Sequence, residues 1–247
     1  MKNINIVIPM AGAGSRFKIS GYDVPKPFIK VNEKMMIEHV LDGLQIDNAS
    51  YTLIIQKSFC NQYEDKLNIL KTKYNVNFII VEKLTQGASC TALAAHQIIN
   101  NNDIVVFADS DNFFNKNILK KFILDAKERN LDGSLLTFKT KEPYFSYVEL
   151  DKQGFAIRTK EKEPISNHAI TGVYLFTKGK NFVKYAIDMM IYGDRTKNEY
   201  YMSNVYNWAI KGGLKIGCFD IEENEWVCVG TPEQLNKYLN KDSHAKF

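Results

Sequence analysis

The stretch INIVIPMAGAGSRFKISGYDVPKPF, residues 4–28, decides the fold, because an apolar run leads directly into a glycine-rich loop. Its first five residues predict a buried strand. Gly12 and Gly14 come next, and glycine lets backbone N–H groups approach anionic oxygens where any Cβ would obstruct them. Arg16 and Lys26 add full positive charges. The stretch therefore predicts a first strand followed by a loop that binds phosphate groups.

The spacing in this loop excludes two other phosphate-binding motifs. A P-loop reads GxxxxGK[ST], with the lysine directly after the second glycine, and the chain has no such run. A dinucleotide fingerprint reads GxGxxG, but Phe17 occupies the position of the third glycine. What remains is GxGxR with a Pro-Lys-Pro run centred ten residues after Arg16. The alternative interpretation is an ordinary turn that carries two basic residues by chance.

The pattern resembles the nucleotidyltransferases (EC 2.7.7 type) that activate sugar phosphates and related metabolites, whose signature is a GxGxR loop with a downstream Pro-Lys. The resemblance extends along most of the chain, to the GTPE run at residues 230–233. It implies that the loop wraps a nucleoside triphosphate, and that Arg16 and Lys26 are catalytic, stabilising charge as pyrophosphate leaves. The nucleotide contacts would then come from the loop residues Ala11, Gly12, Ala13, Gly14 and Ser15.

The composition is that of an ordinary globular protein that handles small anionic ligands. Of its 247 residues, 45% are hydrophobic and 24% are charged, which is typical of one α/β domain. The chain has no 18-residue apolar run, and the first strand is too short for a signal peptide, so we expect a cytoplasmic protein without a membrane partner. The net charge of +4 is scattered, and small anions explain it without nucleic acid. A homo-oligomer stays open.

Apolar, β-rich runs alternate with helical patterns through the first half of the chain. Strands that are apolar throughout and separated by helices are typical of a parallel sheet covered on both faces. We expect strands over residues 4–8, 51–56, 76–81 and 104–107, and helices over residues 36–44, 61–73, 89–99 and 115–124.

The second half contains strands that follow one another, which predicts a mixed part of the sheet. We expect them over residues 131–139, 147–151, 155–159 and 171–177, with a hairpin turn at residues 151–154. No linker or repeat divides the chain. We therefore predict a single α/β domain, Rossmann-like and, given the resemblance, of the GT-A type, with a mostly parallel mixed sheet and helices on both faces. Within residues 1–247, residues 1–115 would form mainly a nucleotide-binding lobe and residues 130–235 mainly an acceptor-binding lobe.

An acidic loop, ADSDNFF at residues 108–114, follows the fourth strand of the first half. Asp109 and Asp111 are hard oxygen ligands of the kind that hold Mg²⁺, or Mn²⁺, on a triphosphate. The family's strand-end aspartate stands before an asparagine and an aromatic residue, as Asp111 does, while Asp109 would contact the nucleotide as well. A turn that caps the next helix is the alternative. The same DxD pattern occurs in class A glycosyltransferases, whose N-terminal loop does not resemble GxGxR.

The second metal ligand of the family departs from its usual form. It is usually an aspartate in a WxDxGTP run, but here the run is WVCVGTP, residues 226–232, with Cys228 in that place. A thiol is a poor ligand for Mg²⁺. Either a nearby carboxylate, Asp220 or Glu225, serves instead, or phosphate oxygens and water complete the coordination shell.

The nucleobase site is expected in the run EKLTQGAS at residues 82–89, between a strand and a helix. In the family a glutamine five or six residues before a glycine contacts the base, and counting back from Gly87 reaches Glu82. An ionised carboxylate only accepts hydrogen bonds, so Glu82 favours an amino group such as cytosine N4. Gln86, Gly87 and Ala88 would line the same pocket. Glu82 as a solvated strand end is the alternative.

The acceptor site is expected around Glu161 and Lys162, in a run that resembles the family's Glu-Lys-Pro segment. Lys162 would contact the acceptor phosphate and Glu161 the acceptor body; a solvated charged turn is the alternative. Thr171 and Gly172 match the strand that lines this pocket, and Glu199 matches an acidic helix start.

Together these features predict the transfer of an NMP, favoured as CMP from CTP, to a phosphorylated small molecule with release of pyrophosphate. The resemblance is strongest to the branch that serves bacterial capsule and surface polysaccharides, and a CTP:phosphoglutamine cytidylyltransferase is one candidate. The alternatives are a sugar-1-phosphate uridylyl-, guanylyl- or cytidylyltransferase and, in another class, a DxD glycosyltransferase. A third class, suggested only by Cys228, is a catalytically weak nucleotide-binding module.

Overall fold

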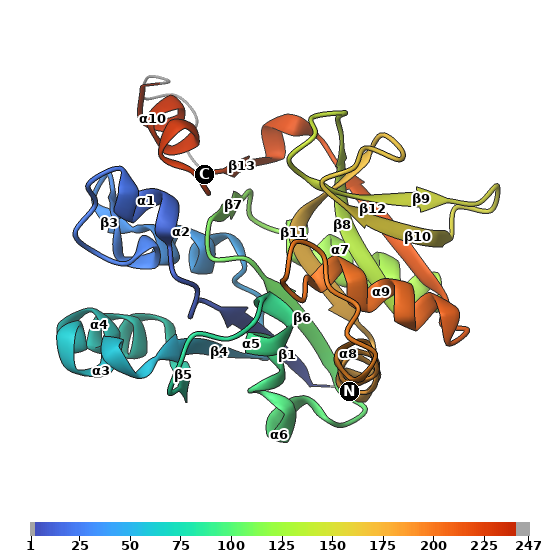
Figure 1. Ribbon diagram of the computed structural model, residues 1–247, viewed down its shortest axis with the longest axis horizontal. Coiled ribbons are helices and arrows are strands. Elements are labelled where there is room, and N and C mark those ends of the chain that lie inside the picture. Colours follow the sequence, from blue (N-terminus) through green and yellow to red (C-terminus); the bar gives the residue numbers. More distant parts are fainter. Residues whose placement is uncertain (1–2, 241–247) are drawn as a thin grey trace.

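A nine-stranded sheet runs through the molecule in the computed structural model, which describes residues 3–240 (Figure 1). Its main path has the order β10-β9-β11-β6-β1-β4-β5, while β8 pairs with β11 and with β12. The strands are β1 (Ile4–Pro9), β4 (Ala49–Gln56), β5 (Val76–Val81), β6 (Ile104–Ala108), β8 (Gly133–Lys139), β9 (Ser146–Leu150), β10 (Ala156–Glu161), β11 (His168–Phe176) and β12 (Ile216–Ile221). Two small sheets accompany it, β2 (Lys30–Val31) with β3 (Lys34–Met35), and β7 (Asn112–Phe114) with β13 (Trp226–Cys228).

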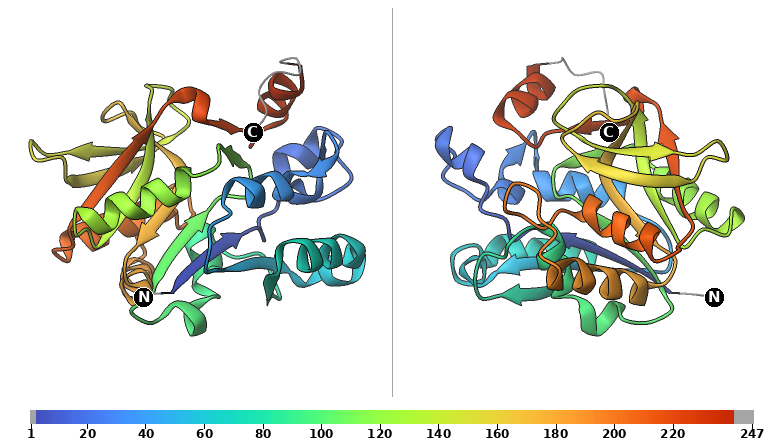
Figure 2. Two further views of the ribbon diagram at one scale, coloured as in Figure 1. Left: turned by 180° about the vertical axis from the view of Figure 1, so that it is seen from behind. Right: turned by 45° about the vertical axis from the view of Figure 1, so that its right-hand side comes forward.

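Helices cover both faces of this sheet. Alternation along β1 shows why, because Ile6 and Ile8 enter one buried cluster while Val7 enters the other. Figure 1 shows α8 and α9 in front of the sheet, and the view from behind in Figure 2 brings α7 forward. The helices are α1 (Ser15–Ile19), α2 (Met36–Gly43), α3 (Lys57–Gln62), α4 (Glu64–Tyr74), α5 (Ala88–Leu93), α6 (His96–Ile99), α7 (Ile118–Glu128), α8 (Gly179–Ile191), α9 (Met202–Lys211) and α10 (Pro232–Asn240), with 3₁₀ turns η1 (Lys26–Phe28) and η2 (Glu223–Glu225).

Strand directions divide the sheet in the way that the sequence predicts. In the first half, β1 lies parallel to both β4 and β6, and β4 lies parallel to β5. In the second half, β11 runs antiparallel to β6 and β8, and β9 pairs antiparallel with β10. The predicted fold class, a single α/β domain with a mostly parallel mixed sheet, is confirmed. So is the turn at residues 151–154, where the N–H of Gly154 donates to the Asp151 carbonyl at 3.1 Å.

Three helix predictions are wrong in their extent. The segment 61–73 is divided between α3 and α4, which meet at Tyr63, and the segment 89–99 is divided between α5 and α6. The helix expected over 115–124 begins only at Ile118, because residues 112–114 form β7 and pair with β13, more than 100 residues later. Since α7 starts seven residues beyond Asp111, neither aspartate of the acidic loop caps it.

Strand β11 changes partners halfway, and this opens the sheet next to the end of β6. Residues 173–176 pair with β6, whereas Ala169 pairs with β9. The register against β8 shifts between Ile170 and Tyr174, and Gly172, with a φ of 86°, lies within that shift. A positive φ of this size favours glycine. The irregularity leaves space at the carboxyl ends of the strands, where ligands bind in open α/β sheets.

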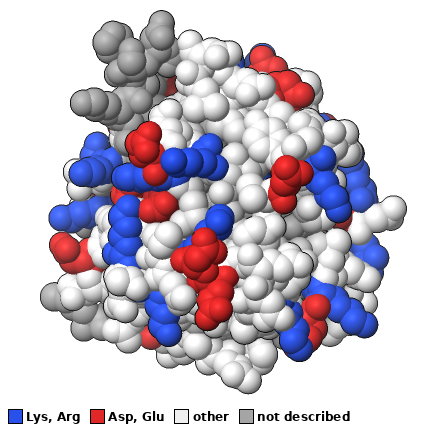
Figure 3. All heavy atoms as spheres, turned by 90° about the vertical axis from the view of Figure 1, so that its left-hand side faces the viewer, with Lys and Arg blue, Asp and Glu red and all other residues white. Residues whose placement is uncertain are grey.

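The described residues carry neither a membrane-crossing helix nor a basic stripe on the face in Figure 3. Within residues 3–240, none of the helices combines the length and apolar character needed to cross a bilayer. Figure 3 shows lysine and arginine interspersed with aspartate and glutamate on the side formed by the N-terminal lobe. That mixture agrees with the scattered charge of the sequence.

Candidate active site

A cavity of about 660 Å³ lies where β11 leaves β6, and it brings together residues from both halves of the chain. Many of the predicted site residues line it, namely Arg16, Ala88, Asp109, Asp111, Glu161, Lys162, Thr171 and Gly172. The sequence places these residues in segments up to 156 positions apart, yet the structure collects them at one edge of the sheet. The cavity is therefore the candidate active site.

The glycine-rich loop is fixed at its start and open along its length. The N–H of Met10 donates to the Ile54 carbonyl at 3.0 Å, and the side-chain amide of Gln56 donates to the Ala11 carbonyl at 2.8 Å. Gly12 is exposed and has nothing near the position of a Cβ, while Gly14 has a φ of 60°. Ala13 and Ser15 are also exposed. The loop is thus held by its neighbour β4 while its outer side stays accessible to a phosphate chain.

Lys26 connects this loop to the acidic loop. Its ammonium lies 2.6 Å from Oδ2 of Asp111, and a Cβ on Gly14 would lie 3.6 Å from the Cβ of Lys26. Burial acts to lower the pKa of Lys26, but the charges of Asp111 and Asp109 outweigh it and raise that pKa above its ordinary value. Lys26 is therefore a permanent cation between the predicted phosphate loop and the predicted metal ligands.

Two glycines make room for the two carboxylates of the acidic loop. A Cβ on Gly172 would overlap with Oδ2 of Asp109, and a Cβ on Gly230 would lie 2.7 Å from Oδ2 of Asp111. The N–H of Asp109 donates to the Gly172 carbonyl at 2.9 Å, which fixes the loop against β11. Burial and the nearby Asp111 raise the pKa of Asp109 well above its usual range. A positive charge next to Asp109 and Asp111 would therefore stabilise their ionised carboxylates.

The donor set of the acidic loop fits a divalent cation such as Mg²⁺. Asp109 and Asp111 supply hard oxygens, and the buried Oδ1 of Asn112 beside them has no hydrogen-bond partner. No three side chains of His, Cys, Asp or Glu gather to hold an ion anywhere in the part of the chain that is described. Magnesium commonly uses one or two carboxylates and takes its other ligands from water and phosphate, so two carboxylates suffice.

Cys228 lies beside the acidic loop as the family resemblance implies. Strand β13 pairs with β7 so that Cys228 is opposite Asn112. Burial and the charge of Asp111 raise the pKa of the Cys228 thiol to about 12, which keeps it protonated, and its sulfur lies 3.5 Å from Oε1 of Gln234. A neutral thiol does not replace a carboxylate as a magnesium ligand.

Asp220 and Glu225, one of the two alternatives for the missing ligand, do not line the cavity. The Asp220 carboxylate lies 3.0 Å from both Lys139 Nζ and His168 Nδ1, on the outer part of the sheet. The Glu225 carboxylate accepts the N–H of Glu222 at 3.0 Å. Phosphate oxygens and water are the remaining candidates for the rest of the shell.

The acceptor side of the cavity contains a buried carboxylate beside a lysine. Glu161 accepts hydrogen bonds from the hydroxyls of Ser146 and Ser203, and its side chain is only 6% exposed. Lys162 Nζ lies 3.8 Å from Glu161 Oε1 and 5.4 Å from the centre of the Tyr201 ring. The Glu161 carboxylate is thus an oriented hydrogen-bond acceptor, and the Lys162 ammonium beside it is a partly exposed cation. This pair suits a substrate that carries both hydrogen-bond donors and an anionic group.

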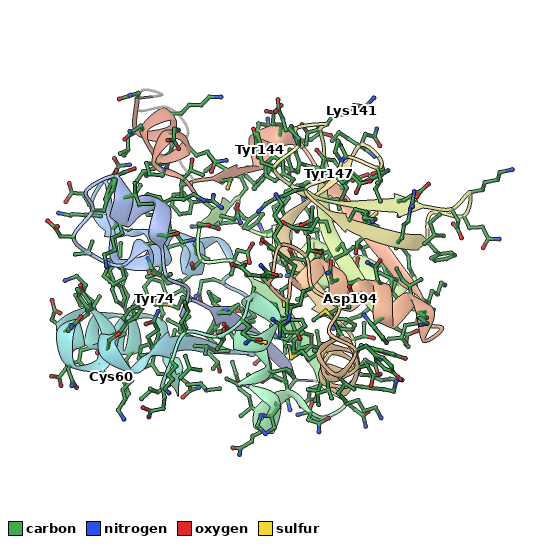
Figure 4. The ribbon with its side chains drawn as sticks, in the orientation of Figure 1. Cys60, Tyr74, Lys141, Tyr144, Tyr147 and Asp194 are labelled. Carbon is green, nitrogen blue, oxygen red and sulfur yellow. The ribbon has the colours of Figure 1, made fainter. Side chains whose placement is uncertain are left out.

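Aromatic side chains complete the wall. Tyr144 and Phe145 line the cavity from the segment between β8 and β9, and Tyr201 lines it from the start of α9. Figure 4 shows Tyr144 beside Tyr147, on the same side of the molecule as Lys141. Burial and the charge of Glu199 raise the pKa of Tyr201 to about 12, so its hydroxyl stays neutral.

The residues expected to contact the nucleobase lie outside the wall of the cavity, with the exception of Ala88. The Glu82 carboxylate pairs with Lys57 at 2.9 Å, and both side chains are more than 60% exposed. Gln86 is exposed, and Gly87, with a φ of 128°, starts α5. Glu199, expected to contact the acceptor, is exposed next to Tyr201 and does not line the cavity. Gln86 and Gly87 lie at the amino end of α5, directly before Ala88, which lines the cavity.

Several residues in or beside the cavity escape prediction from the sequence. Gln56 is the last residue of the buried strand β4 and holds the glycine-rich loop through Ala11, and a polar residue at the end of such a strand is a usable signal. Glu233 and Gln234, at the start of α10, line the cavity and directly follow the Gly-Thr-Pro sequence at residues 230–232. Ser146 and Ser203 carry no local signal, since their hydroxyls matter only through Glu161.

The chain matches a family model and several known proteins. The model described as Nucleotidyl transferase matches residues 6–244. The bifunctional protein GlmU of Buchnera aphidicola is 27% identical over 235 residues, which cover 91% of this chain and 49% of that protein. A 2-C-methyl-D-erythritol 4-phosphate cytidylyltransferase of Thermosipho africanus is 30% identical over 150 residues, covering 59% of this chain and 62% of that protein. The chain spans about half the length of the GlmU proteins it matches.

Solved structures share the fold. A nucleoside-diphosphate-sugar pyrophosphorylase from Vibrio cholerae superposes with a TM-score of 0.82 at 22% identity, covering 96% of this chain and all of that one (100%). An inositol-1-phosphate CTP transferase from T. maritima superposes with a TM-score of 0.73 at 16% identity, covering 99% of both chains. At these identities the likeness extends to the fold alone.

Proposed function

Because this chain belongs to the nucleotidyl transferase family, we propose that it transfers a nucleoside monophosphate from a nucleoside triphosphate to a phosphorylated small molecule and releases pyrophosphate. The observation that carries the proposal is the ion pair of Lys26 with Asp111. It joins the glycine-rich loop to the acidic loop at the edge of a cavity large enough for a small acceptor. We assign residues 1–115 mainly to the nucleotide and residues 130–235 mainly to the acceptor.

In the proposed reaction an oxygen of the acceptor phosphate attacks the α-phosphorus. A new P–O bond forms, the bond from the α-phosphorus to the bridging oxygen breaks, and the electron pair leaves with pyrophosphate. The glycine-rich loop, Ala11 to Ser15, would hold the phosphates through backbone N–H groups. Lys26 and Arg16 would stabilise the negative charge that develops on the transferred and leaving groups. A phosphate is already ionised, so the acceptor needs no general base.

A divalent cation belongs to this proposal, with Asp111 as its first ligand and Asp109 as its second. Mg²⁺, or Mn²⁺ in its place, would supply charge neutralisation at the α-phosphate. Direct binding of Mn²⁺, followed by electron paramagnetic resonance, tests the assignment without turnover. We expect Asp111→Asn to abolish the bound signal and Asp109→Asn to weaken it, while Asp151→Asn, in the β9–β10 turn, leaves it unchanged.

The acceptor would lie on the other side of the cavity. Lys162 would bind its phosphate, and Glu161, fixed by two serine hydroxyls, would accept hydrogen bonds from its body. Thr171 and Gly172 would line the pocket, and Glu199 would contact the acceptor from its rim. The charge of Arg16 in the same cavity supports an anionic acceptor.

For the nucleotide we favour CTP, and the exposed Glu82 is the residue proposed to accept a hydrogen bond from cytosine N4. To do so it must exchange its ion pair with Lys57, which is weak because both side chains are solvated. Relatives that act as cytidylyltransferases support this choice of base. The most specific part of the proposal is that phosphoglutamine is the acceptor and that the reaction serves capsule synthesis.

A pyrophosphate-release screen tests the function. Five triphosphates (CTP, UTP, dTTP, GTP and ATP) would each be combined with glucose 1-phosphate, inositol 1-phosphate and phosphoglutamine. We expect CTP to give the highest rate. A clear preference for UTP or GTP with a sugar 1-phosphate would favour the sugar-1-phosphate nucleotidyltransferase instead. Absence of pyrophosphate with every pair, together with turnover of a nucleotide sugar, would favour the glycosyltransferase.

A further inference from the structure

The segment 193–201, between α8 and α9, is hydrogen-bonded to the segment 86–89, more than 100 residues away in the sequence. The N–H of Tyr200 donates to the Gln86 carbonyl at 2.8 Å. The Tyr200 carbonyl accepts from the N–H and the hydroxyl of Ser89 at 3.2 Å and 2.7 Å. A Cβ on Gly87 would lie 2.5 Å from this carbonyl oxygen, so the two backbones are in close contact. The two segments therefore behave as one unit.

Arg195 adds a side-chain contact to Gln86 across the two segments. Its guanidinium donates to Gln86 Oε1 at 2.7 Å and lies 4.6 Å from the centre of the Tyr200 ring. That ring is 4% exposed, and its hydroxyl donates to the Met190 carbonyl at 3.3 Å. Figure 4 places Asp194, the residue before Arg195, beside α9, and its carboxylate accepts from the Trp208 indole at 2.8 Å. A fixed aromatic support thus orients a planar cation toward Gln86.

The joined segments contact both proposed substrate regions. Ala88 on one segment and Tyr201 on the other line the cavity, and Tyr201 lies against Lys162. Gln86 and Gly87 belong to the region assigned to the nucleobase. Arg195 belongs to the half of the chain assigned to the acceptor, and Gln86 belongs to the half assigned to the nucleotide. By fixing Gln86, Arg195 therefore connects the two halves.

We propose that Arg195 is a positioning residue for the nucleotide, acting through Gln86 to orient the segment 86–88 against the base. The proposal rests on the proposed function, because it assumes that a nucleotide binds there. Arg195 itself does not need to touch the nucleotide. Its contribution should appear in nucleotide affinity and not in the chemical step, since Lys26 and Asp111 lie in other segments.

The test is a calorimetric titration of nucleotide without acceptor, so that no turnover is needed. The probe is whichever of MgCTP, MgUTP, MgdTTP, MgGTP and MgATP the wild-type protein binds. The variants are Arg195→Ala, Gln86→Ala, the double variant and Arg195→Lys. Lys184→Ala is the control, because Lys184 is an exposed cation on α8 that pairs with Asp188 at 3.0 Å. Thermal melting of each variant accompanies the titrations.

We expect Arg195→Ala to raise the dissociation constant roughly 3- to 10-fold, within the range of one typical intramolecular hydrogen bond. Gln86→Ala should act similarly. The double variant should bind the nucleotide no more weakly than the weaker-binding of the two single variants. Arg195→Lys should recover only part of the affinity, while kcat stays within about 2-fold of wild type and Lys184→Ala changes nothing.

Two results would overturn the inference. Unchanged nucleotide affinity in Arg195→Ala would show that Arg195 positions nothing, and losses that multiply in the double variant would show that it does not act through Gln86. These failures differ from failure of the proposed function. If the wild-type protein binds none of the five nucleotides, both the function and the inference are rejected.

Discussion

The ammonium of Lys26 lies 2.6 Å from Oδ2 of Asp111, although the two residues are 85 positions apart. Asp111 follows the central strand β6, and Lys26 begins a short turn after the glycine-rich loop. The pair thus joins the part of the site that would hold phosphates to the part that would hold a metal. In the absence of substrate each charge neutralises the other, which makes it less costly to keep both groups preorganised in a half-buried site.

The first prediction follows from this pair. Lys26→Ala should lower kcat by at least about 100-fold, the usual cost of removing one preorganised donor from a site that stabilises developing charge. The measurement is pyrophosphate release at saturating substrates. Lys34→Ala is the control, because Lys34 also pairs with an aspartate, Asp42, at 2.5 Å but lies outside the cavity. A fully active Lys26→Ala protein would remove Lys26 from the mechanism.

The second prediction separates steric need from backbone strain at a glycine. Gly172 and Gly154 have similar φ values, 86° and 82°, but only Gly172 has a carboxylate, that of Asp109, where a Cβ would stand. Gly154→Ala should cost about 1 to 2 kcal/mol of unfolding free energy, from the left-handed backbone alone. Gly172→Ala should cost about 1 to 3 kcal/mol more, because Asp109 must move.

The same displacement should reach the metal site. Mn²⁺ affinity should fall in Gly172→Ala and stay unchanged in Gly154→Ala, with urea unfolding and metal titration measured on the same preparations. Equal stabilities for the two variants would mean that the space beside Asp109 is not needed.

The extent to which the sequence predicts this fold depends on how local each feature is. The strand over residues 4–8 and the loop with Gly12 and Gly14 are encoded within one short run, and both are found where expected. The pairing of β7 with β13 depends on residues more than 100 positions apart, so the asparagine and two phenylalanines of β7 gave no strand signal on their own. Long-range pairing of this kind overrides local propensity.

The site shows the same division between local and distant information. The sequence indicates that Asp111 and Lys162 are chemically important, but only the partner change of β11 shows that they share a cavity. The contact between Arg195 and Gln86 likewise joins two loops that have no pattern in common. Where the role of a side chain depends on an irregularity of the fold, such as the partner change of β11, composition, spacing and periodicity do not predict that role.

The third prediction concerns pH and the carboxylate of Asp220, away from the cavity. Burial acts to raise the pKa of Asp220, but hydrogen bonds from Thr137, Lys139 and His168 outweigh it and lower that pKa below its ordinary value near 4. A lowered pKa in the folded state contributes stability that is present above the unfolded value and is lost as the pH falls through the folded value.

Asp220→Asn should therefore destabilise the protein at pH 7 by about 0.5 to 1 kcal/mol, since the group is partly screened by solvent. The difference from wild type should shrink as the pH falls below about 4. Thermal melting between pH 3 and 7 measures it, with Glu223→Gln, at an exposed carboxylate of η2, as the control. A difference that grows toward acid pH would contradict the assigned sign.

The last prediction tests whether Cys228 stands in the place of a metal ligand. Its thiol, with a pKa of about 12, is neutral and lies on the strand that pairs beside Asp111. Cys228→Asp should tighten Mg²⁺ binding on the order of 10-fold, because a further negative charge beside Asp111 and Asp109 attracts the cation in a partly dehydrated site. Cys228→Ser, which changes the atom without adding charge, should leave the affinity near that of wild type. The measurement is competition of Mg²⁺ against bound Mn²⁺, which needs no turnover. Unchanged affinity in Cys228→Asp would place the cation away from β13 and assign it to Asp111 and Asp109 with phosphate and water alone.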